Sequence, residues 1–172
     1  KDAVLFASTM GFELEPKLHS PVILGPRDTA TYLSAPTPEM FHKKIAHAAA
    51  EIRSRHEVVV FEGTGHPGVG SVVDLSNADV AKELGSGVIL ILEGGIGNTL
   101  DRLTLCEAVF KNKGIPIHGV IINKVLQDKV DKIRKYMKIG LARRGLRLLG
   151  IIPYEEELVY PQMRHIVKAA KA

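Results

Sequence analysis

Residues 58–79 read VVVFEGTGHPGVGSVVDLSNAD, and this stretch governs the interpretation of the rest of the chain. An unbroken apolar run ends on an acidic residue, Glu62, and a glycine-rich loop follows at once. Such a run predicts a strand of a parallel sheet that is covered on both faces. An acidic side chain at the end of a buried strand costs free energy unless a ligand or partner compensates its charge. Glu62 is therefore a candidate metal ligand, and Gly63 and Gly65 are candidates for close approach of phosphate oxygens to the backbone.

Apolar runs of this kind recur along the chain and alternate with helical patterns. The predicted strands are Val4–Ala7, Val58–Glu62, Val88–Leu92, His118–Asn123 and Leu146–Ile152. Apolar residues at three- and four-residue steps predict helices at Pro38–Arg55, Asn98–Lys113 and Asp128–Arg144. Strands that alternate with helices favour right-handed βαβ units. We therefore expect an α/β fold of three layers with a doubly wound, mainly parallel sheet.

The residues that follow each predicted strand are informative, because ligands bind beyond the carboxyl ends of parallel strands. EGGIGN follows one strand and opens a helix, so Gly95 and Gly97 are candidate phosphate-binding residues. Asn123–Lys124 is similar to the base-reading element of guanine-nucleotide-binding proteins, but Leu126 stands where those proteins carry an Asp. An Asn amide can still pair with an adenine edge, which favours ATP over GTP. Pro153, after the last strand, completes the set of nucleotide-binding candidates.

Length and composition are those of one folded domain, with 172 residues, 45% of them hydrophobic and 24% charged. We expect residues 1–172 to form a single nucleotide-binding-type domain with a long irregular loop at residues 8–38, a proline-rich stretch. The single cysteine, Cys106, excludes an internal disulfide and predicts a buried thiol in a reducing, cytoplasmic location. Pro161–Ala172 is expected to be a short helix or a frayed end.

Charge is unevenly distributed along the chain. Residues 128–147 hold eight basic and two acidic residues, whereas the whole chain has a net charge of +4. This pattern favours a solvated helix face over a nucleic-acid site. No apolar stretch is long enough to span a membrane. The histidines are too scattered to predict a metal site, and we keep only His66, in the glycine loop, as a further candidate.

Four segments carry a resemblance to a known family, and they read FEGTGHPGVGSVVDLSNADVAKEL, ILEGGIGNTLDRL, GVIINKV and LRLLGIIPY. In this order they resemble the P-loop NTPase group that includes dethiobiotin synthetase and the cobyrinic acid a,c-diamide synthases. They are also similar to the dethiobiotin-synthetase-like domain of large phosphotransacetylases. The resemblance covers Val58 to Tyr154 and implies a P-loop NTPase-like fold. It further implies that Glu62 helps to bind Mg²⁺, and that Asn123 and Ile152–Tyr154 flank the adenine.

One part of the family pattern is missing from the sequence. These families begin with a strand and a phosphate-binding loop of the form G-x-x-x-x-G-K-[ST], and no such loop occurs here. Val4–Ala7 resembles the family's second strand, and the chain begins at Lys1 rather than at Met. We expect that the chain lacks an N-terminal strand, P-loop and helix. The alternative is a domain that has kept the fold and lost hydrolysis.

The functional expectation is an ATP- and Mg²⁺-binding domain of a ligase-like or synthase-like NTPase. It would use ATP to activate a carboxylate of a small acidic substrate whose identity the sequence does not give. The alternative is a non-catalytic domain that senses nucleotide as a regulatory module or serves as a scaffold. A homodimer is compatible with either reading, and neither nucleic acid nor a membrane is an expected partner.

Overall fold

The computed structural model describes residues 2–25 and 27–158 of the chain. The chain divides into two compact units. Unit 1 comprises Lys1–Val88 and Cys106–Pro116, and unit 2 comprises Ile89–Leu105 and Ile117–Ala172. The predicted single domain stays a prediction, and the segment Pro161–Ala172 lies outside the described residues.

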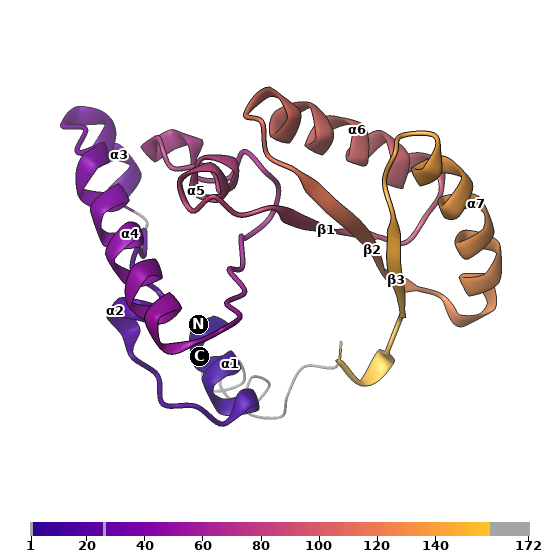
Figure 1. The fold of residues 1–172 in the computed structure, drawn as a ribbon, viewed down its shortest axis with the longest axis horizontal. Coiled ribbons are helices and arrows are strands. Elements are labelled where there is room, and N and C mark those ends of the chain that lie inside the picture. The colour runs from indigo at the N-terminus through magenta and orange to yellow at the C-terminus, as the bar shows by residue number, and fades with distance from the viewer. Residues whose placement is uncertain (1, 26, 159–172) are drawn as a thin grey trace, which may run out of the picture. The chain divides into compact units, whose positions relative to one another are not determined.

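Unit 2 is built on a three-stranded sheet in the order β1-β2-β3 (Figure 1). The strands are β1 (Val88–Glu93), β2 (Ile117–Val125) and β3 (Leu148–Pro153). β2 and β3 are parallel, with Val120 opposite Leu148 and Val125 opposite Pro153. After the last residue of β1, the Gly94 amide donates to the carbonyl oxygen of Asn123 near the end of β2, at 2.7 Å. The three carboxyl ends therefore meet at one edge, and the predicted parallel α/β fold is confirmed.

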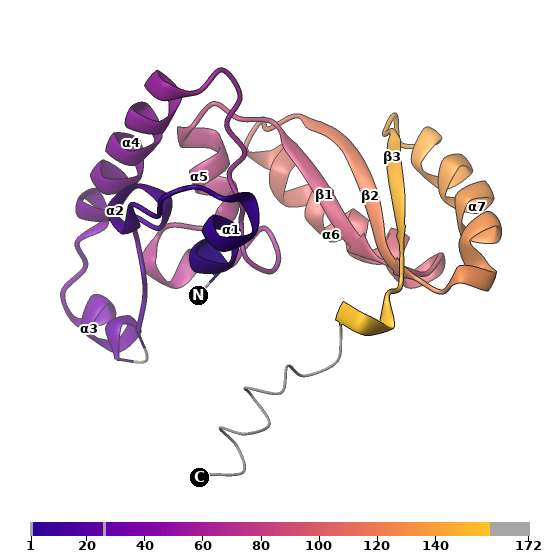
Figure 2. The ribbon, with the colours of Figure 1, turned by 90° about the horizontal axis from the view of Figure 1, so that it is seen from below.

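Two helices cover one face of this sheet (Figures 1 and 2). They are α6 (Gly97–Asn112) and α7 (Val130–Ala142), and the 3₁₀ turn η2 (Gln127–Lys129) precedes α7. The two helices pack on each other, since a Cβ added at Gly140 of α7 would lie 3.0 Å from Leu100 Cδ1 of α6. On β1 the alternation is clear, because Leu90 is buried whereas Ile91 is 62% exposed. Unit 2 thus buries one face of the strand and leaves apolar side chains on the other.

Unit 1 is helical and holds its own small core. Its helices are α1 (Asp2–Met10), α2 (Pro16–His19), α3 (Asp28–Ser34), α4 (Pro38–Arg55) and α5 (Asn77–Glu83), with the 3₁₀ turn η1 (Ser71–Val73) before α5. The remaining 3₁₀ turn, η3 (Glu156–Leu158), follows β3 in unit 2. The core of unit 1 gathers Tyr32, Val73 and Leu75, with Val22, Phe41, Ile45 and Val80 packed against them. Tyr32 stacks on Phe41 with ring centroids 5.7 Å apart, so α3 and α4 share this core.

Two of the five predicted strands are wrong. Val4–Ala7 lies inside helix α1, and among these residues only Ala7 is buried. A run of four apolar residues suits a helix as well as a strand, and only a neighbouring strand decides between them. Val58–Glu62 has no regular secondary structure and forms no ladder with any described residue, and Val60 is 88% exposed. The apolar sequence therefore predicts a buried strand for which the described part of the chain supplies no partner.

The stretch at residues 8–38 is more regular than the sequence suggests. The last turn of α1 and the short helices α2 and α3 fall inside it. Pro16 begins α2, where its missing N–H costs nothing because the first N–H groups of a helix have no partner in it. Pro16 thus starts a short helix, and Pro36 lies between α3 and α4.

Helices α4 and α5 are joined by two polar contacts within unit 1. His42 Nδ1 lies 2.5 Å from Glu83 Oε2. Arg53 Nη2 donates to the carbonyl oxygen of Leu84 at 2.7 Å and thereby caps the end of α5. The hydrogen bond to Glu83 and its charge raise the pKa of His42, and partial burial opposes them without reversing the shift.

We expect this raised pKa to make the stability of the protein pH-dependent. The contribution of the His42–Glu83 pair is fully present below the unfolded pKa of about 6.5 and is lost as the pH rises through the higher folded pKa. Because the pair is partly exposed, the melting temperature should fall between pH 6 and pH 9 by about 2–4 °C more in the wild type than in His42→Gln. Thermal unfolding by circular dichroism measures the difference. The control His56→Gln, just after α4, should follow the wild type, and equal pH dependence in all three proteins would contradict the assignment.

Candidate functional site

The predicted site residues fall in both units. Glu62, Gly63 and Gly65 belong to unit 1, and Gly95, Gly97, Asn123 and Pro153 belong to unit 2.

Glu62 is held in place through the residue before it. The guanidinium of Arg53 lies over the ring of Phe61, 5.3 Å from its centroid, while the same side chain caps α5 at Leu84. A cation over an aromatic face is attracted by the negative face of the ring. Arg53 thus ties the segment before Glu62 to the end of α5. The Glu62 side chain itself is exposed.

The loop after Glu62 is fastened by one side chain of α5. Asn77 Nδ2 donates to the carbonyl oxygens of Thr64 at 2.8 Å and His66 at 2.9 Å. A Cβ added at Gly63 would lie 2.9 Å from Asn77 Cγ, so no larger residue fits there without movement of Asn77. Gly63 is therefore required by the packing of the loop itself. No signal in the sequence points to Asn77, because its two acceptors lie more than ten residues away.

The loop then closes on itself before α5 begins. The Gly68 amide donates to His66 Nδ1 at 3.2 Å, so the His66 ring helps to form the turn. At the start of α5, Ser76 and Asp79 form a capping box, in which each side chain bonds the backbone amide of the other. Lys113 Nζ lies 2.5 Å from Asp79 Oδ1. Burial alone would raise the pKa of Asp79, but the hydrogen bonds from Lys113 and Ser76 outweigh it and lower that pKa.

The carboxylate of Glu62 is exposed at the start of this loop, and an isolated carboxylate fits Mg²⁺ better than it fits most metals. Mg²⁺ is commonly held by one or two carboxylates, with phosphate oxygens and water completing its octahedron. Glu62 forms no hydrogen bond or ion pair with a described residue. Within residues 2–25 and 27–158, no three His, Cys, Asp or Glu side chains gather around a possible metal position. Glu62 could therefore supply one protein ligand, and its role stays a prediction.

In unit 2, the end of β1 is tightly joined to the end of β2. A Cβ added at Gly94 would lie 3.0 Å from Val125 Cγ2 and 3.2 Å from the carbonyl oxygen of Lys124. Thr99, in the first turn of α6 and only 2% exposed, donates to the carbonyl oxygen of Glu93 at 2.8 Å. At Gly95 a Cβ would lie 3.0 Å from Thr99 Oγ1. Gly94 and Gly95 therefore serve the turn from strand to helix.

Gly97 differs from these two glycines. It is the first residue of α6, and a Cβ added there would meet nothing within 4 Å. The packing of the described residues gives no reason for glycine at this position. Its predicted role, which is to let an anion approach the first N–H groups of α6, is not tested by the structure and stays a prediction.

Asn123 and Pro153 lie at neighbouring strand ends, as predicted. Pro153 pairs with Val125 across β2 and β3, and the amide of Tyr154 donates to the carbonyl oxygen of Val125 at 2.8 Å. Asn123 Oδ1 accepts from the amide of Lys124 at 2.8 Å. The Asn123 Nδ2 group forms no hydrogen bond with a described residue, so it can donate to a ligand.

Glu93, also at this edge, is not among the site residues predicted from the sequence. It ends β1, and its carboxylate lies near Lys124 Nζ at 3.4 Å and near Arg102 Nη1 at 3.5 Å. The signal was present, because Glu93 precedes two glycines just as Glu62 precedes a glycine-rich loop. The two cations converge on it from β2 and α6, which only the fold brings together.

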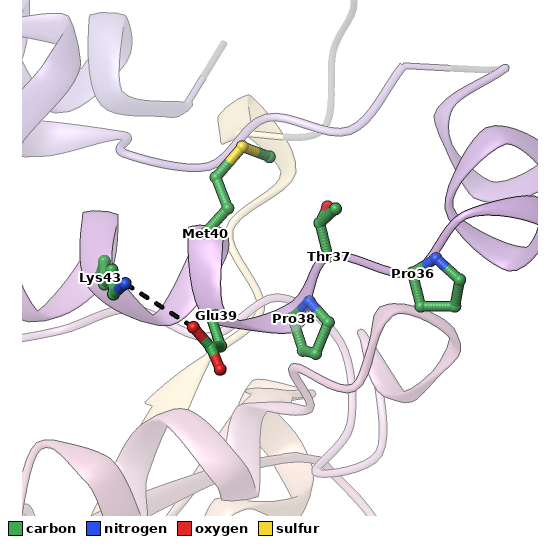
Figure 3. Close-up of a pocket in the computed structure, with 6 residues that line it drawn as sticks. All are labelled: Pro36, Thr37, Pro38, Glu39, Met40 and Lys43. Carbon is green, nitrogen blue, oxygen red and sulfur yellow. Dashed lines mark ion pairs between the residues drawn. The ribbon is translucent and has the colours of Figure 1, made fainter.

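A separate hollow lies at the start of α4 and contains none of the predicted site residues (Figure 3). Its volume is about 570 Å³, and it is lined by Pro36, Thr37, Pro38, Glu39, Met40 and Lys43. The Glu39–Lys43 pair there is 3.6 Å apart and more than 80% exposed on both sides. Because one short segment lines this hollow, it gives no support to a binding site.

The cysteine and the basic helix face have the surroundings that the sequence predicts. Cys106 is buried, and that burial raises the pKa of its thiol, as expected for a structural cysteine. The basic residues of α7 and its flanks are exposed, with the buried face formed by Ile133, Met137 and Leu141. This agrees with a solvated helix face. No helix among the described residues is both long and apolar enough to cross a bilayer.

Comparison with known families gives these features a context. A family model described as an AAA domain matches residues 28–162. The chain belongs to this family. It is 25% identical over 129 residues to a cobyric acid synthase of Desulfitobacterium hafniense. The aligned residues make up 72% of this chain and 24% of that protein. It is 31% identical over 81 residues to an ATP-dependent dethiobiotin synthetase of Anaeromyxobacter dehalogenans strain 2CP-C. Here the aligned residues make up 47% of this chain and 36% of that protein.

A second dethiobiotin synthetase, from Anaeromyxobacter dehalogenans strain 2CP-1, is 28% identical over 116 residues, which cover 67% of this chain and 51% of that protein. The chain thus spans between about a quarter and a half of the length of these curated relatives. The matches confirm that this AAA domain is of the P-loop NTPase type to which dethiobiotin synthetase and cobyric acid synthase belong.

Proposed function

We propose that this AAA domain binds ATP with Mg²⁺ and serves an enzyme that activates a carboxylate of a small acidic substrate, as ligases do. The observation that carries the proposal is the edge of the β1-β2-β3 sheet, where three parallel strands end. That edge gathers the glycine turn into α6, the Asn123 amide and Pro153. In parallel α/β sheets this is the position at which ligands bind.

Different groups of the chain would contact the base, the phosphates and the metal. Asn123 Nδ2 donates to the adenine edge, with the side chain oriented by the bond from the Lys124 amide to Oδ1. The first N–H groups of α6, beginning at Gly97, face the negative charge of the bound ligand. In unit 1, Glu62 supplies a carboxylate to Mg²⁺. Bound Mg²⁺ would neutralise phosphate charge during phosphoryl transfer. The relative named an ATP-dependent dethiobiotin synthetase supports the choice of ATP and of a ligase-like reaction.

Isothermal titration calorimetry with ATP and magnesium chloride tests the binding step. We expect Asn123→Ala to weaken ATP binding about tenfold, because one hydrogen-bond donor to the base is lost. Asn112→Ala, at the exposed end of α6, is the matched control and should bind like the wild type. We expect GTP to bind no better than ATP, because Leu126 offers no carboxylate to guanine. Failure of the wild type to bind either nucleotide would overturn the proposal.

The regulatory alternative predicts binding without turnover. Release of inorganic phosphate from ATP, measured with a panel of small carboxylic acids, separates the two. Phosphate release that depends on an acid supports the ligase-like function. Tight ATP binding with no release for any acid in the panel would favour the sensing domain.

A further inference from the structure

Three charged side chains meet at the carboxyl edge of the sheet in unit 2. Glu93 comes from the end of β1, Lys124 from the end of β2 and Arg102 from α6. Lys124 Nζ lies 3.4 Å from Glu93 Oε1, and Arg102 Nη1 lies 3.5 Å from Glu93 Oε2. Each carboxylate oxygen thus faces a different cation. The cluster contains two positive charges and one negative charge, so one cation remains unbalanced.

The backbone beneath these side chains is fixed, whereas the side chains are exposed. The Asn123 carbonyl and the Gly94 amide join the two strands at 2.7 Å, and Thr99 holds the carbonyl oxygen of Glu93. All three charged side chains are between 56% and 60% exposed. The cations are therefore presented to solvent from anchored positions.

The backbone of Lys124 is also unusual. Its φ angle is +57°, in the left-handed region that non-glycine residues seldom adopt. Such strain persists where the surrounding structure imposes it, and it clusters at ligand sites. The bond between the Lys124 amide and Asn123 Oδ1 helps to hold this conformation. An exposed ion pair contributes too little to explain why the strained position carries a lysine.

We propose that Lys124 and Arg102 form a binding site for a carboxylate of the acidic substrate other than the one that ATP activates, and that Glu93 occupies this site until the substrate displaces it. The proposal rests on the proposed function, which requires such a substrate. The distances of 3.4 and 3.5 Å are longer than those of strong charge-assisted hydrogen bonds, so Glu93 is a weak occupant. The planar fork of an Arg guanidinium suits the two oxygens of a carboxylate. Displacement of Glu93 exchanges one carboxylate for another and needs no proton transfer.

Titration of the protein with glutarate, a small dicarboxylate, tests this site by calorimetry and by nuclear magnetic resonance shifts of the Lys124 amide. We expect Glu93→Gln to tighten glutarate binding about three- to fivefold, because an exposed ion pair no longer competes. Lys124→Gln and Arg102→Gln should each weaken it by a similar factor. The matched controls are Asp101→Asn, which removes an exposed negative charge beside Arg102, and Lys132→Gln on α7. Both controls should bind glutarate like the wild type.

Two outcomes would overturn the inference. One is that Glu93→Gln and Asp101→Asn have the same effect, because glutarate would then respond only to overall charge. The other is that the affinity for inorganic triphosphate changes across the Glu93, Lys124 and Arg102 variants as predicted for glutarate, while the affinity for glutarate does not change. The two cations would then bind phosphate rather than a carboxylate. Titration of ATP with Mg²⁺ into the same samples keeps the two proposals apart. If the wild type does not bind ATP, the proposed function is overturned. If it binds ATP but its affinity for glutarate does not depend on Glu93, only this inference is overturned.

Discussion

Replacement of Gly70 by alanine should destabilise the protein by about 3 kcal/mol and lower its melting temperature by about 6–12 °C. A Cβ at Gly70 would lie 2.1 Å from the carbonyl oxygen of Leu75, a distance that requires the backbone to move. The φ angle of Gly70 is +97°, which adds backbone strain for any other residue. Both effects act at the same position.

The surrounding structure cannot relax easily around this clash. The Gly70 carbonyl oxygen accepts from the amides of Val73 at 3.0 Å and Leu75 at 3.1 Å, so the loop folds back on the glycine. Val73 and Leu75 are core residues of unit 1 and are 1% and 8% exposed. Movement of the Leu75 carbonyl would therefore disturb the core that α3, α4 and this loop share.

Thermal and urea unfolding of Gly70→Ala measure the loss, and Gly85→Ala is the matched control. Gly85 has a φ angle of +60°, and a Cβ added there would meet nothing within 4 Å. That variant carries the backbone strain without the clash and should lose only about 1 kcal/mol. Equal losses in the two variants would show that the contact with Leu75 is not the cause.

The sequence predicts those elements whose signals are local. The prediction of Pro38–Arg55 coincides with α4, because Pro38 suits the first position of a helix and His56 returns to extended backbone. The predictions for α6 and α7 also agree approximately with the structure. Gly114 follows α6 and Gly145 follows α7, and both glycines have positive φ angles. Helical periodicity and stop signals lie within one segment and need no distant partner.

Strands depend on neighbours that a single sequence does not specify. His118–Asn123 is apolar and pairs with β1 and β3, whereas the equally apolar Val58–Glu62 pairs with no described residue. No periodicity distinguishes the two segments. The candidate site also has a part that could be predicted and a part that could not. Asn123 and Pro153 could be placed at strand ends, because each lies at or just after the end of an apolar run in the sequence. The convergence of Arg102 on Glu93 could not be predicted, since it depends on how α6 packs beside β1.

Replacement of Glu62 by glutamine should weaken Mg²⁺-dependent ATP binding about 10- to 100-fold. This is the range seen when groups that support a metal ligand are removed, and loss of the ligand itself should cost at least as much. Glutamine keeps the size of the side chain but replaces a charged oxygen with a neutral one. The exposure of Glu62 means that the substitution disturbs no hydrogen bond or ion pair with a described residue, so the fold should be unaffected.

Calorimetry with ATP in magnesium chloride and again in EDTA isolates the metal-dependent part of the affinity. Glu62→Gln should lose affinity only when Mg²⁺ is present. Glu57→Gln is the matched control, because Glu57 is exposed in the same segment between α4 and the glycine-rich loop and the charge change is identical. A loss of equal size with and without Mg²⁺ would assign Glu62 to general electrostatics. Unchanged affinity in both conditions would remove its metal role, because the carboxylate that follows Phe61 would then be an exposed side chain without a ligand.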